Sequence, residues 1–250
     1  DWKYVKEYKK NNELKIGLTA SIEAYGNTSL ISRLKWAKDV GIDFYYSFRS
    51  QEYLKERIDY KPFLNEGYKI ITVEFGANPL IYFPMANIKK DIDFVFLASS
   101  NADKQKRYFE WLPNILNNHS GFIDGPGWHK ILRWASQPTH KYIYARAKIG
   151  LNLHIDDSID WASELNERTY ILAACGTPQL IDNAKLLPKR FSSEAMFRGE
   201  TPEEYSRMFE YMFENPLECE RRALIALEEV FEKHTTLHRA DGFILKIKEL

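Results

Sequence analysis

The segment 144–182 constrains the fold most, because it contains a strand, a helix and a second strand in close succession. Residues 148–154 form a short apolar run broken by a single Asn, as is typical of a buried parallel strand. A polar loop leads to a helical pattern over residues 167–175, with Asn166 as the expected N-cap and Gly176 as the residue that follows the helix. This order indicates an α/β fold with a parallel sheet.

Asn152 lies near the carboxyl end of the predicted strand. In open α/β sheets the carboxyl ends of the strands face the ligand crevice, which makes Asn152 a candidate ligand contact. The alternative is an Asn that bonds its own loop, because Asn commonly stabilises turns. Both interpretations stay open.

The predicted helix starts with Glu167, Arg168 and Thr169. Backbone N–H groups and the helix dipole favour a phosphate at such an end. A basic residue there opposes the dipole at a cost on the order of tenths of a kcal/mol, which a bound anion would offset. We therefore predict an anion site at Arg168. The alternative is a surface Arg168 paired weakly with Glu164 or with an Asp of the preceding loop.

Four motifs extend this pattern. They are A-K-I-G-L-N-x-H, L-N-E-R-T and A-C-G-T-P, followed by H-T-x-x-x-R at His234, Thr235 and Arg239. Together they resemble the group 1 glycosyltransferases, and within that group the spore-maturation, CgeB-like branch, over roughly residues 67–239. The resemblance implies a GT-B-like α/β architecture, in which two Rossmann-like lobes with parallel sheets face a cleft and the C-terminal lobe holds the nucleotide.

The resemblance also implies an activity: a glycosyltransferase that moves a sugar from a nucleotide-diphosphate donor to a glycan or other hydroxyl acceptor in polysaccharide biosynthesis. The nucleotide sugar is then a co-substrate, and no cofactor is expected. Family members usually carry an acidic residue for the donor ribose where this chain has Ile171. Glu167 lies one turn earlier on the same helical face and is the expected replacement. An altered donor, an altered pose and a catalytically silent binding or scaffold domain of a larger multidomain protein stay open.

The first part of the chain predicts a short parallel sheet in βαβαβ order, with strands at 14–19, 42–47 and 68–75 and helices at 30–40 and 51–65. A GT-B N-terminal lobe usually has more strands, so this lobe is expected to be reduced or truncated. Residues 75–85 contain Gly, Asn and two prolines and predict a linker. We place the boundary between an acceptor-side lobe, 1–88, and a donor-binding lobe, 89–250. C-terminal helices are expected, with Thr201 capping the first and residues 240–250 returning to the first lobe.

Further donor contacts are expected on the second lobe. A strand at 93–98 leads to Ser100 and Asn101 and then to a helix with Lys106 and Arg107, an arrangement suited to phosphate, although a solvated basic helix face has the same pattern. Trp128 follows the turn D-G-P-G and is a candidate for the nucleobase, or else a core side chain. The predicted donor contacts are Ser100, Asn101, Lys106, Arg107, Trp128, Asn152, Glu167, Arg168, Thr169, Gly176 and Thr177.

Two residues are assigned catalytic roles under this resemblance. Arg168 would stabilise the charge that develops on the leaving diphosphate. If the reaction inverts the sugar configuration, it needs a base, for which Glu23 after the first strand is the candidate. No metal is expected, because the pair Asp91 and Asp93 precedes a strand and because His154 and its acidic neighbours lack the spacing of a ligand set.

Composition excludes several partners. Lys plus Arg and Asp plus Glu each number 35, so no global basic field favours nucleic acid. Two cysteines predict no disulfide framework, and no segment is apolar enough to span a membrane. The expected location is the cytoplasm.

Overall fold

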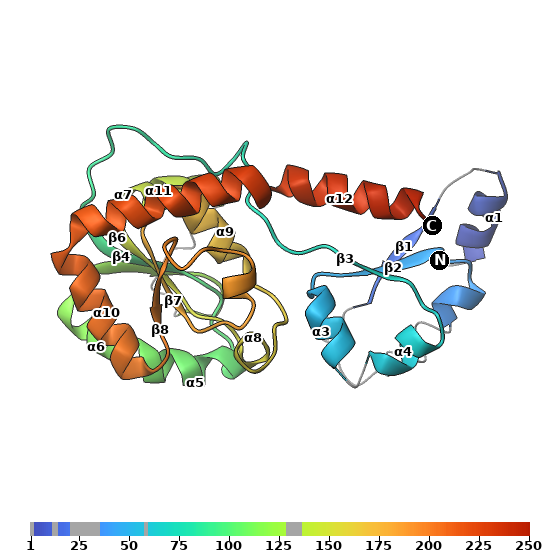
Figure 1. The fold of residues 1–250 in the computed structure, drawn as a ribbon, viewed down its shortest axis with the longest axis horizontal. Coiled ribbons are helices and arrows are strands. Elements are labelled where there is room, and N and C mark those ends of the chain that lie inside the picture. Colours follow the sequence, from blue (N-terminus) through green and yellow to red (C-terminus); the bar gives the residue numbers. More distant parts are fainter. Residues whose placement is uncertain (1–2, 12–14, 21–35, 58–59, 129–136) are drawn as a thin grey trace. The chain divides into compact units, whose positions relative to one another are not determined.

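A computed structural model describes residues 3–11, 15–20, 36–57, 60–128 and 137–250. The chain forms two compact units (Figure 1). Unit 1 comprises Asp1–Glu74 and Arg239–Leu250, and unit 2 comprises Phe75–His238.

Unit 1 contains a three-stranded parallel sheet in the order β1-β2-β3. The strands are β1 (Gly17–Thr19), β2 (Phe44–Ser47) and β3 (Ile70–Thr72), and the described helices include α1 (Lys3–Asn11), α3 (Gln51–Glu56) and α4 (Lys61–Asn65). The single helix predicted over 51–65 is therefore two helices, with Pro62 in the first turn of α4, where a missing N–H costs nothing. Of the helix predicted at 30–40, residues 36–39 are helical and the rest lie outside the described residues.

Unit 2 contains a five-stranded parallel sheet in the order β5-β4-β6-β7-β8. Its strands are β4 (Ile92–Leu97), β5 (Gly121–Asp124), β6 (Ala147–Asn152), β7 (Gln179–Asp182) and β8 (Phe197–Gly199). The chain goes from β4 to β5 on one side and then crosses to β6 on the other side of β4. Strand order thus reverses between β4 and β6, and in such sheets ligands bind at the carboxyl ends beside this switch point.

Helices cover both faces of the unit 2 sheet (Figure 1). Side chains alternate along β4, so that Phe94 and Phe96 face one core and Val95 and Leu97 face the other. The first core includes α5 (Ala102–Trp111), α6 (Pro113–Asn118) and α10 (Pro202–Glu214), and the second includes α7 (Gln137–Arg146), α9 (Glu167–Ala174) and α11 (Pro216–Lys233). The remaining elements are α8 (Asp156–Asp160), η2 (Leu187–Lys189) and α12 (Thr236–Lys248). A buried sheet of this kind explains the apolar runs in the sequence.

The segment predicted to be a linker belongs to unit 2. The backbone N–H of Ala77 donates to His234 O at 3.0 Å, and Thr236 N donates to Ala77 O at 2.8 Å. Ala77 and Tyr82 are buried in the same core as α9. Because of these contacts the compact units divide between residues 74 and 75, whereas the sequence placed the boundary between residues 88 and 89. Residues 239–250 group with unit 1, as expected for the terminal segment.

Thr201 caps α10 as predicted, since its Oγ1 accepts a hydrogen bond from Glu204 N at 3.2 Å. Thr201→Ala should lower the free energy of unfolding by about 1 kcal/mol, because it leaves a helix-end N–H without its acceptor. Thr201→Asn retains a capping oxygen and should stay close to the wild type. Urea unfolding followed by circular dichroism measures both, and equal destabilisation by the two variants would contradict the capping role.

Candidate functional site

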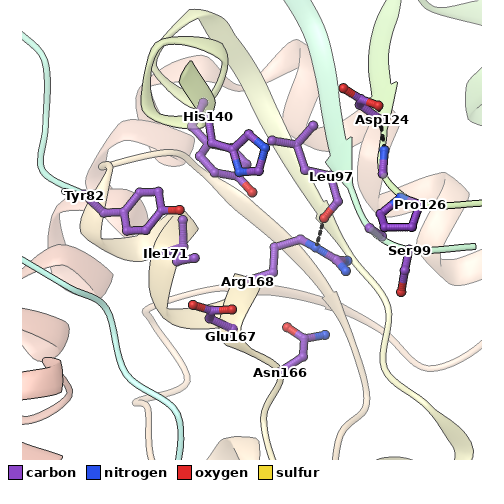
Figure 2. A pocket seen from close by; sticks show the side chains of 13 residues that line it. Tyr82, Leu97, Ser99, Asp124, Pro126, His140, Asn166, Glu167, Arg168 and Ile171 are labelled. Atoms are coloured by element: carbon purple, nitrogen blue, oxygen red, sulfur yellow. Dashed lines mark hydrogen bonds between the residues drawn. The ribbon is translucent and has the colours of Figure 1, made fainter. Parts of the chain in front are cut away.

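A cavity of about 240 Å³ lies in unit 2 at the carboxyl ends of β4 and β5 and beside the start of α9 (Figure 2). This is the edge of the sheet at which strand order reverses. The cavity is lined by Tyr82, Leu97, Ala98, Ser99, Asp124, Gly125, Pro126, His140, Tyr144, Asn166, Glu167, Arg168 and Ile171.

Two glycines allow the loops after β4 and β5 to pack backbone against backbone. Gly125 has a φ of +143°, and a Cβ added there would lie 2.0 Å from Ala98 O. Gly127 has a φ of +86°, and a Cβ there would lie 1.7 Å from Ser100 O. Both positions therefore need glycine, for the backbone conformation and for the close approach. Ser100 N donates to Pro126 O at 2.6 Å, which holds this wall of the cavity together.

The start of α9 forms the opposite wall and agrees with the sequence prediction. Asn166 is the N-cap, and its Oδ1 accepts from Thr169 N at 3.1 Å. Gly176 follows the C-cap with a φ of +65°, the left-handed conformation that ends many helices. The first turn of the helix thus presents Glu167 and Arg168 to the cavity.

The guanidinium of Arg168 joins the ends of β4 and β6. Its Nε donates to Leu97 O at 2.8 Å, and its Nη1 donates to Asn152 Oδ1 at 3.3 Å. The group also lies over the ring of Phe96, 4.7 Å from the ring centre. Figure 2 shows the side chain crossing the cavity toward Leu97. Arg168 is therefore a cavity residue, and the alternative of a surface ion pair does not describe it.

Lys104 is a second cation near Arg168. Its Nζ donates to Ser99 Oγ at 2.7 Å, beside the cavity. Burial lowers the pKa of Lys104, and the positive charge of Arg168 lowers it further. Glu164 opposes this effect. Two cations at the wall of one cavity favour an anionic ligand. Lys104 lies on the same helix as Lys106 and Arg107, the two cations that the sequence predicts as phosphate contacts.

Lys106 and Arg107 do not line the cavity. Lys106 is exposed on α5. Arg107 instead pairs with Asp182 at the end of β7, with Nη2 donating to Oδ2 at 3.1 Å, and it lies over the ring of Trp111. The helix places Arg107 on the face that packs toward β7, so the role of Arg107 in the structure is an ion pair with the buried Asp182.

Asp182 also binds His154. Its Oδ2 accepts from His154 N at 2.7 Å, and its Oδ1 lies 2.7 Å from His154 Nδ1. Burial opposes ionisation of this carboxyl, but the charge and hydrogen bonds of His154, together with Arg107, hold its pKa below the ordinary Asp value. Asp182, at the end of β7, is thus a buried anion that bonds both to Arg107 on α5 and to His154, just after β6.

Asn152 and Thr169 are both buried and lie outside the cavity lining. Their side chains bond to each other, with Asn152 Nδ2 donating to Thr169 Oγ1 at 2.8 Å. Asn152 therefore follows neither sequence interpretation closely, since it neither reaches the cavity nor bonds only its own loop.

Five other predicted contacts have structural roles and do not line the cavity. Asn101 caps α5. Ser100 Oγ accepts from Gln105. Trp128 stacks on Tyr108, with ring centres 5.8 Å apart, and its Nε1 donates to Ala98 O at 2.7 Å, in line with the core alternative. The other two, Gly176 and Thr177, lie at the far end of α9. Glu23 lies outside the described residues.

Glu167, Ile171, Tyr82 and His140 line the cavity on the side of Arg168 away from Ser99 (Figure 2). Tyr144 also lines the cavity. Burial by the cavity walls raises the pKa of the Glu167 carboxyl, although much of the residue stays exposed, and His140 opposes the rise. Sequence reasoning missed the three ring-bearing residues. Tyr82 lies in a segment interpreted as a linker, and His140 and Tyr144 lie on α7, which carries no motif.

Two searches of the described residues give negative results. In that part of the chain, no three His, Cys, Asp or Glu side chains are grouped so that they could hold a metal ion. Within the same residues, every helix is too short or too polar to cross a membrane.

Comparison with known families decides the relationship that the motifs suggested. Residues 97–244, more than half of the chain, match the family described as glycosyl transferase-like. The chain belongs to this family. No curated protein matches the chain.

Solved structures agree with the fold. A glycosyltransferase from Rickettsia africae has a TM-score of 0.67 at 13% identity, over 99% of this chain and 80% of that one. Sucrose-phosphate synthase from Thermosynechococcus elongatus has a TM-score of 0.64 at 11% identity, over 99% and 77%. Anabaena HepE in complex with UDP-glucose has a TM-score of 0.63 at 9% identity, over 100% and 77%. These likenesses confirm the predicted α/β, GT-B-like fold class.

Proposed function

We propose that the chain binds a nucleoside-diphosphate sugar in the unit 2 cavity and transfers the sugar to a hydroxyl of a glycan or glycoconjugate without a metal ion. The proposal retains the CgeB-like branch, the role in polysaccharide biosynthesis and the cytoplasmic location. In the reaction the bond between the anomeric carbon and the diphosphate oxygen breaks, and a bond from the acceptor oxygen to that carbon forms. If the reaction inverts the sugar configuration, the acceptor proton passes to a base, for which Glu23 stays a prediction. A retaining reaction needs no such base, and the proton then passes to the leaving diphosphate.

The observation that carries the proposal is the pair of cations at the switch point. Arg168 lies in the cavity wall, and Lys104 donates to Ser99, another residue of that wall. Backbone N–H groups at the start of α9 add positive potential on the same side. Groups of this kind, held in place before the reaction, stabilise the charge that develops on a leaving diphosphate.

Calorimetry with UDP-, GDP- and TDP-sugars tests the proposal. Because the Anabaena protein is in complex with UDP-glucose, that sugar nucleotide comes first. We expect binding of at least one donor and slow release of its nucleoside diphosphate, with faster release when a glycan acceptor is added. The absence of binding across the panel would contradict the proposal.

Glu167 should contact ligand hydroxyls, in place of the acidic residue expected at Ile171. Glu167→Ala should then weaken donor binding about tenfold, because hydrogen bonds to a charged group each contribute roughly 1.5–3 kcal/mol. The raised pKa adds a pH dependence: the carboxylate accepts hydroxyl hydrogen bonds only when ionised, so wild-type affinity should increase as the pH rises through that pKa. Calorimetry from pH 4 to pH 7 measures this, and a flat profile in the wild type would contradict the role.

A catalytically silent binding domain is the second candidate, favoured by Ile171. This side chain lines the cavity, so an apolar group stands where family members usually carry a carboxylate. Donor hydrolysis separates the two functions. Donor binding with no release of nucleoside diphosphate, even with glycan acceptors, would favour the silent domain.

A further inference from the structure

A buried polar network lies beneath the start of α9. Asn152 is 0% exposed, and its Nδ2 donates to Thr169 Oγ1 at 2.8 Å and to Gln179 Oε1 at 2.7 Å. Its Oδ1 accepts from Asn166 Nδ2 at 2.7 Å and from Arg168 Nη1 at 3.3 Å. Both donors and both acceptor positions of the amide are therefore used, a complete satisfaction that a buried amide needs.

The backbone oxygen of Thr169 fixes the orientation of two side-chain amides in this network, first that of Gln179 and through it that of Asn152. Gln179 Nε2 donates to Thr169 O at 3.1 Å, and because a carbonyl oxygen only accepts, Gln179 must turn its Oε1 toward Asn152. Asn152 must then present its Nδ2 to Gln179, which turns its Oδ1 toward Asn166 and Arg168. An amide flip at either residue would set like groups against each other.

Thr169 closes the network on the other side. Its hydroxyl accepts from Asn152 and lies 3.2 Å from Asn166 Oδ1, the cap atom of α9. His154 Nε2 lies 3.4 Å from the same hydroxyl. The cap of the helix and the acceptor for Arg168 are thus held by one set of buried bonds.

The guanidinium of Arg168 donates to two fixed acceptors, the backbone Leu97 O and the Asn152 Oδ1 that this network orients. It also lies over the ring of Phe96. A guanidinium carries five N–H donors in one plane, so two bonds fix the plane without exhausting its donors. Its direction in the cavity therefore depends on a side chain that does not itself line the cavity.

We propose that Asn152, oriented by Gln179 and Thr169, is a positioning residue that aims the Arg168 guanidinium at the diphosphate of the donor. This inference rests on the proposed function. It assigns Asn152 to the phosphate half of the site through Arg168, with no contact of its own to the nucleotide.

The test compares affinities for the tightest-binding of UDP, GDP and TDP and for its parent nucleoside. The ratio is the dissociation constant of the nucleoside divided by that of the nucleoside diphosphate, and it isolates the contribution of the phosphates to binding. A loss of protein stability alone would not change this ratio. Asn152→Ala should reduce the ratio roughly tenfold, the expected size of one hydrogen-bonded contribution to a charged group. Thr169→Val should reduce the ratio less than Asn152→Ala does. Thr169→Ser keeps the hydroxyl and should have the ratio of the wild type.

Tyr205→Phe is the matched control. The Tyr205 hydroxyl donates to Leu180 O at 3.1 Å and accepts from Asn152 N at 3.1 Å, so the variant loses buried bonds to backbone atoms of β7 and β6 while the side-chain bonds of Asn152 stay in place. It should lower the melting temperature and leave the ratio unchanged. An equal fall in the ratio for Tyr205→Phe, or an unchanged ratio for Asn152→Ala, would overturn the inference.

Arg168→Ala separates this inference from the proposed function. A wild-type protein that binds the diphosphate no better than the nucleoside overturns the proposed function and the inference with it. A ratio that falls for Arg168→Ala but not for Asn152→Ala overturns the inference alone.

Discussion

Arg168→Ala should weaken binding of nucleoside diphosphates about 100-fold, while affinity for the parent nucleoside changes little. The expected size corresponds to two charge-assisted hydrogen bonds to phosphate at roughly 1.5 kcal/mol each. The guanidinium lies in the cavity wall at the switch point of the sheet, already bonded to Leu97 O and Asn152 Oδ1. Calorimetry on the folded variant measures the change. With a nucleotide-sugar donor, turnover should fall by roughly 10²-fold, as it does when one preorganised donor is removed.

Two further variants control for charge and for position. Arg168→Lys keeps the positive charge but loses the planar fork, so its affinity should lie between those of the wild type and the alanine variant. Lys106→Ala removes an exposed cation on α5, outside the cavity lining, and should bind as the wild type does. Equal losses for Lys106→Ala and Arg168→Ala would show that binding depends on overall charge, and an unchanged affinity in Arg168→Ala would contradict the assignment of the site.

The parts of the site that follow from local rules were predictable. Asn166 as N-cap and Gly176 after the helix are signals carried by single residues, and both hold in the structure. An Arg in the first turn of a helix opposes the helix dipole, and this conflict was the reason to predict an anion site at Arg168. The structure places Arg168 in the cavity wall, and the anion itself stays a prediction. Local conflicts of this kind are expected at functional sites.

The parts that depend on tertiary pairing were not predictable. Arg107 and Lys104 are three residues apart on α5, and nothing in the sequence says which of them meets a buried acid. The structure gives Arg107 an ion pair with Asp182, 75 positions along the chain, and bonds Lys104 to Ser99 in the cavity wall. Trp128 was ambiguous for the same reason, since only its stacking on Tyr108 reveals a packing role.

The cavity needed information from three separate segments. Tyr82 comes from the segment before β4, His140 from α7 and Asp124 from the end of β5. The segments of Tyr82 and His140 carry no motif that indicates a ligand, and the turn that contains Asp124 pointed to Trp128 instead. The order of strands and helices and the family resemblance therefore indicated the fold class, whereas the far wall of the site required the arrangement of the chain in space.

Asp182→Asn should lower the free energy of unfolding by about 3 kcal/mol, because removing one partner of a buried ion pair leaves the other charge without compensation. The Asp182 side chain is 0% exposed and accepts from His154 N at 2.7 Å and from Arg107 Nη2 at 3.1 Å. Urea unfolding measures the loss. Asp91→Asn is the matched control, since Asp91 forms a two-bond pair with Arg146 at the surface, and its loss should change stability little.

The effect of Asp182 should also depend on pH, in a direction set by its lowered pKa. A carboxyl whose pKa is lower in the folded than in the unfolded protein stabilises the fold fully above the unfolded value, near 4, and loses that contribution as the pH falls through the folded value. The wild type should therefore approach Asp182→Asn in stability as the pH falls below about 4. A stability difference that stays constant down to pH 2 would show that Asp182 contributes through packing rather than through its charge, and the ion pair with Arg107 would then lose its assigned role in holding α5 against β7.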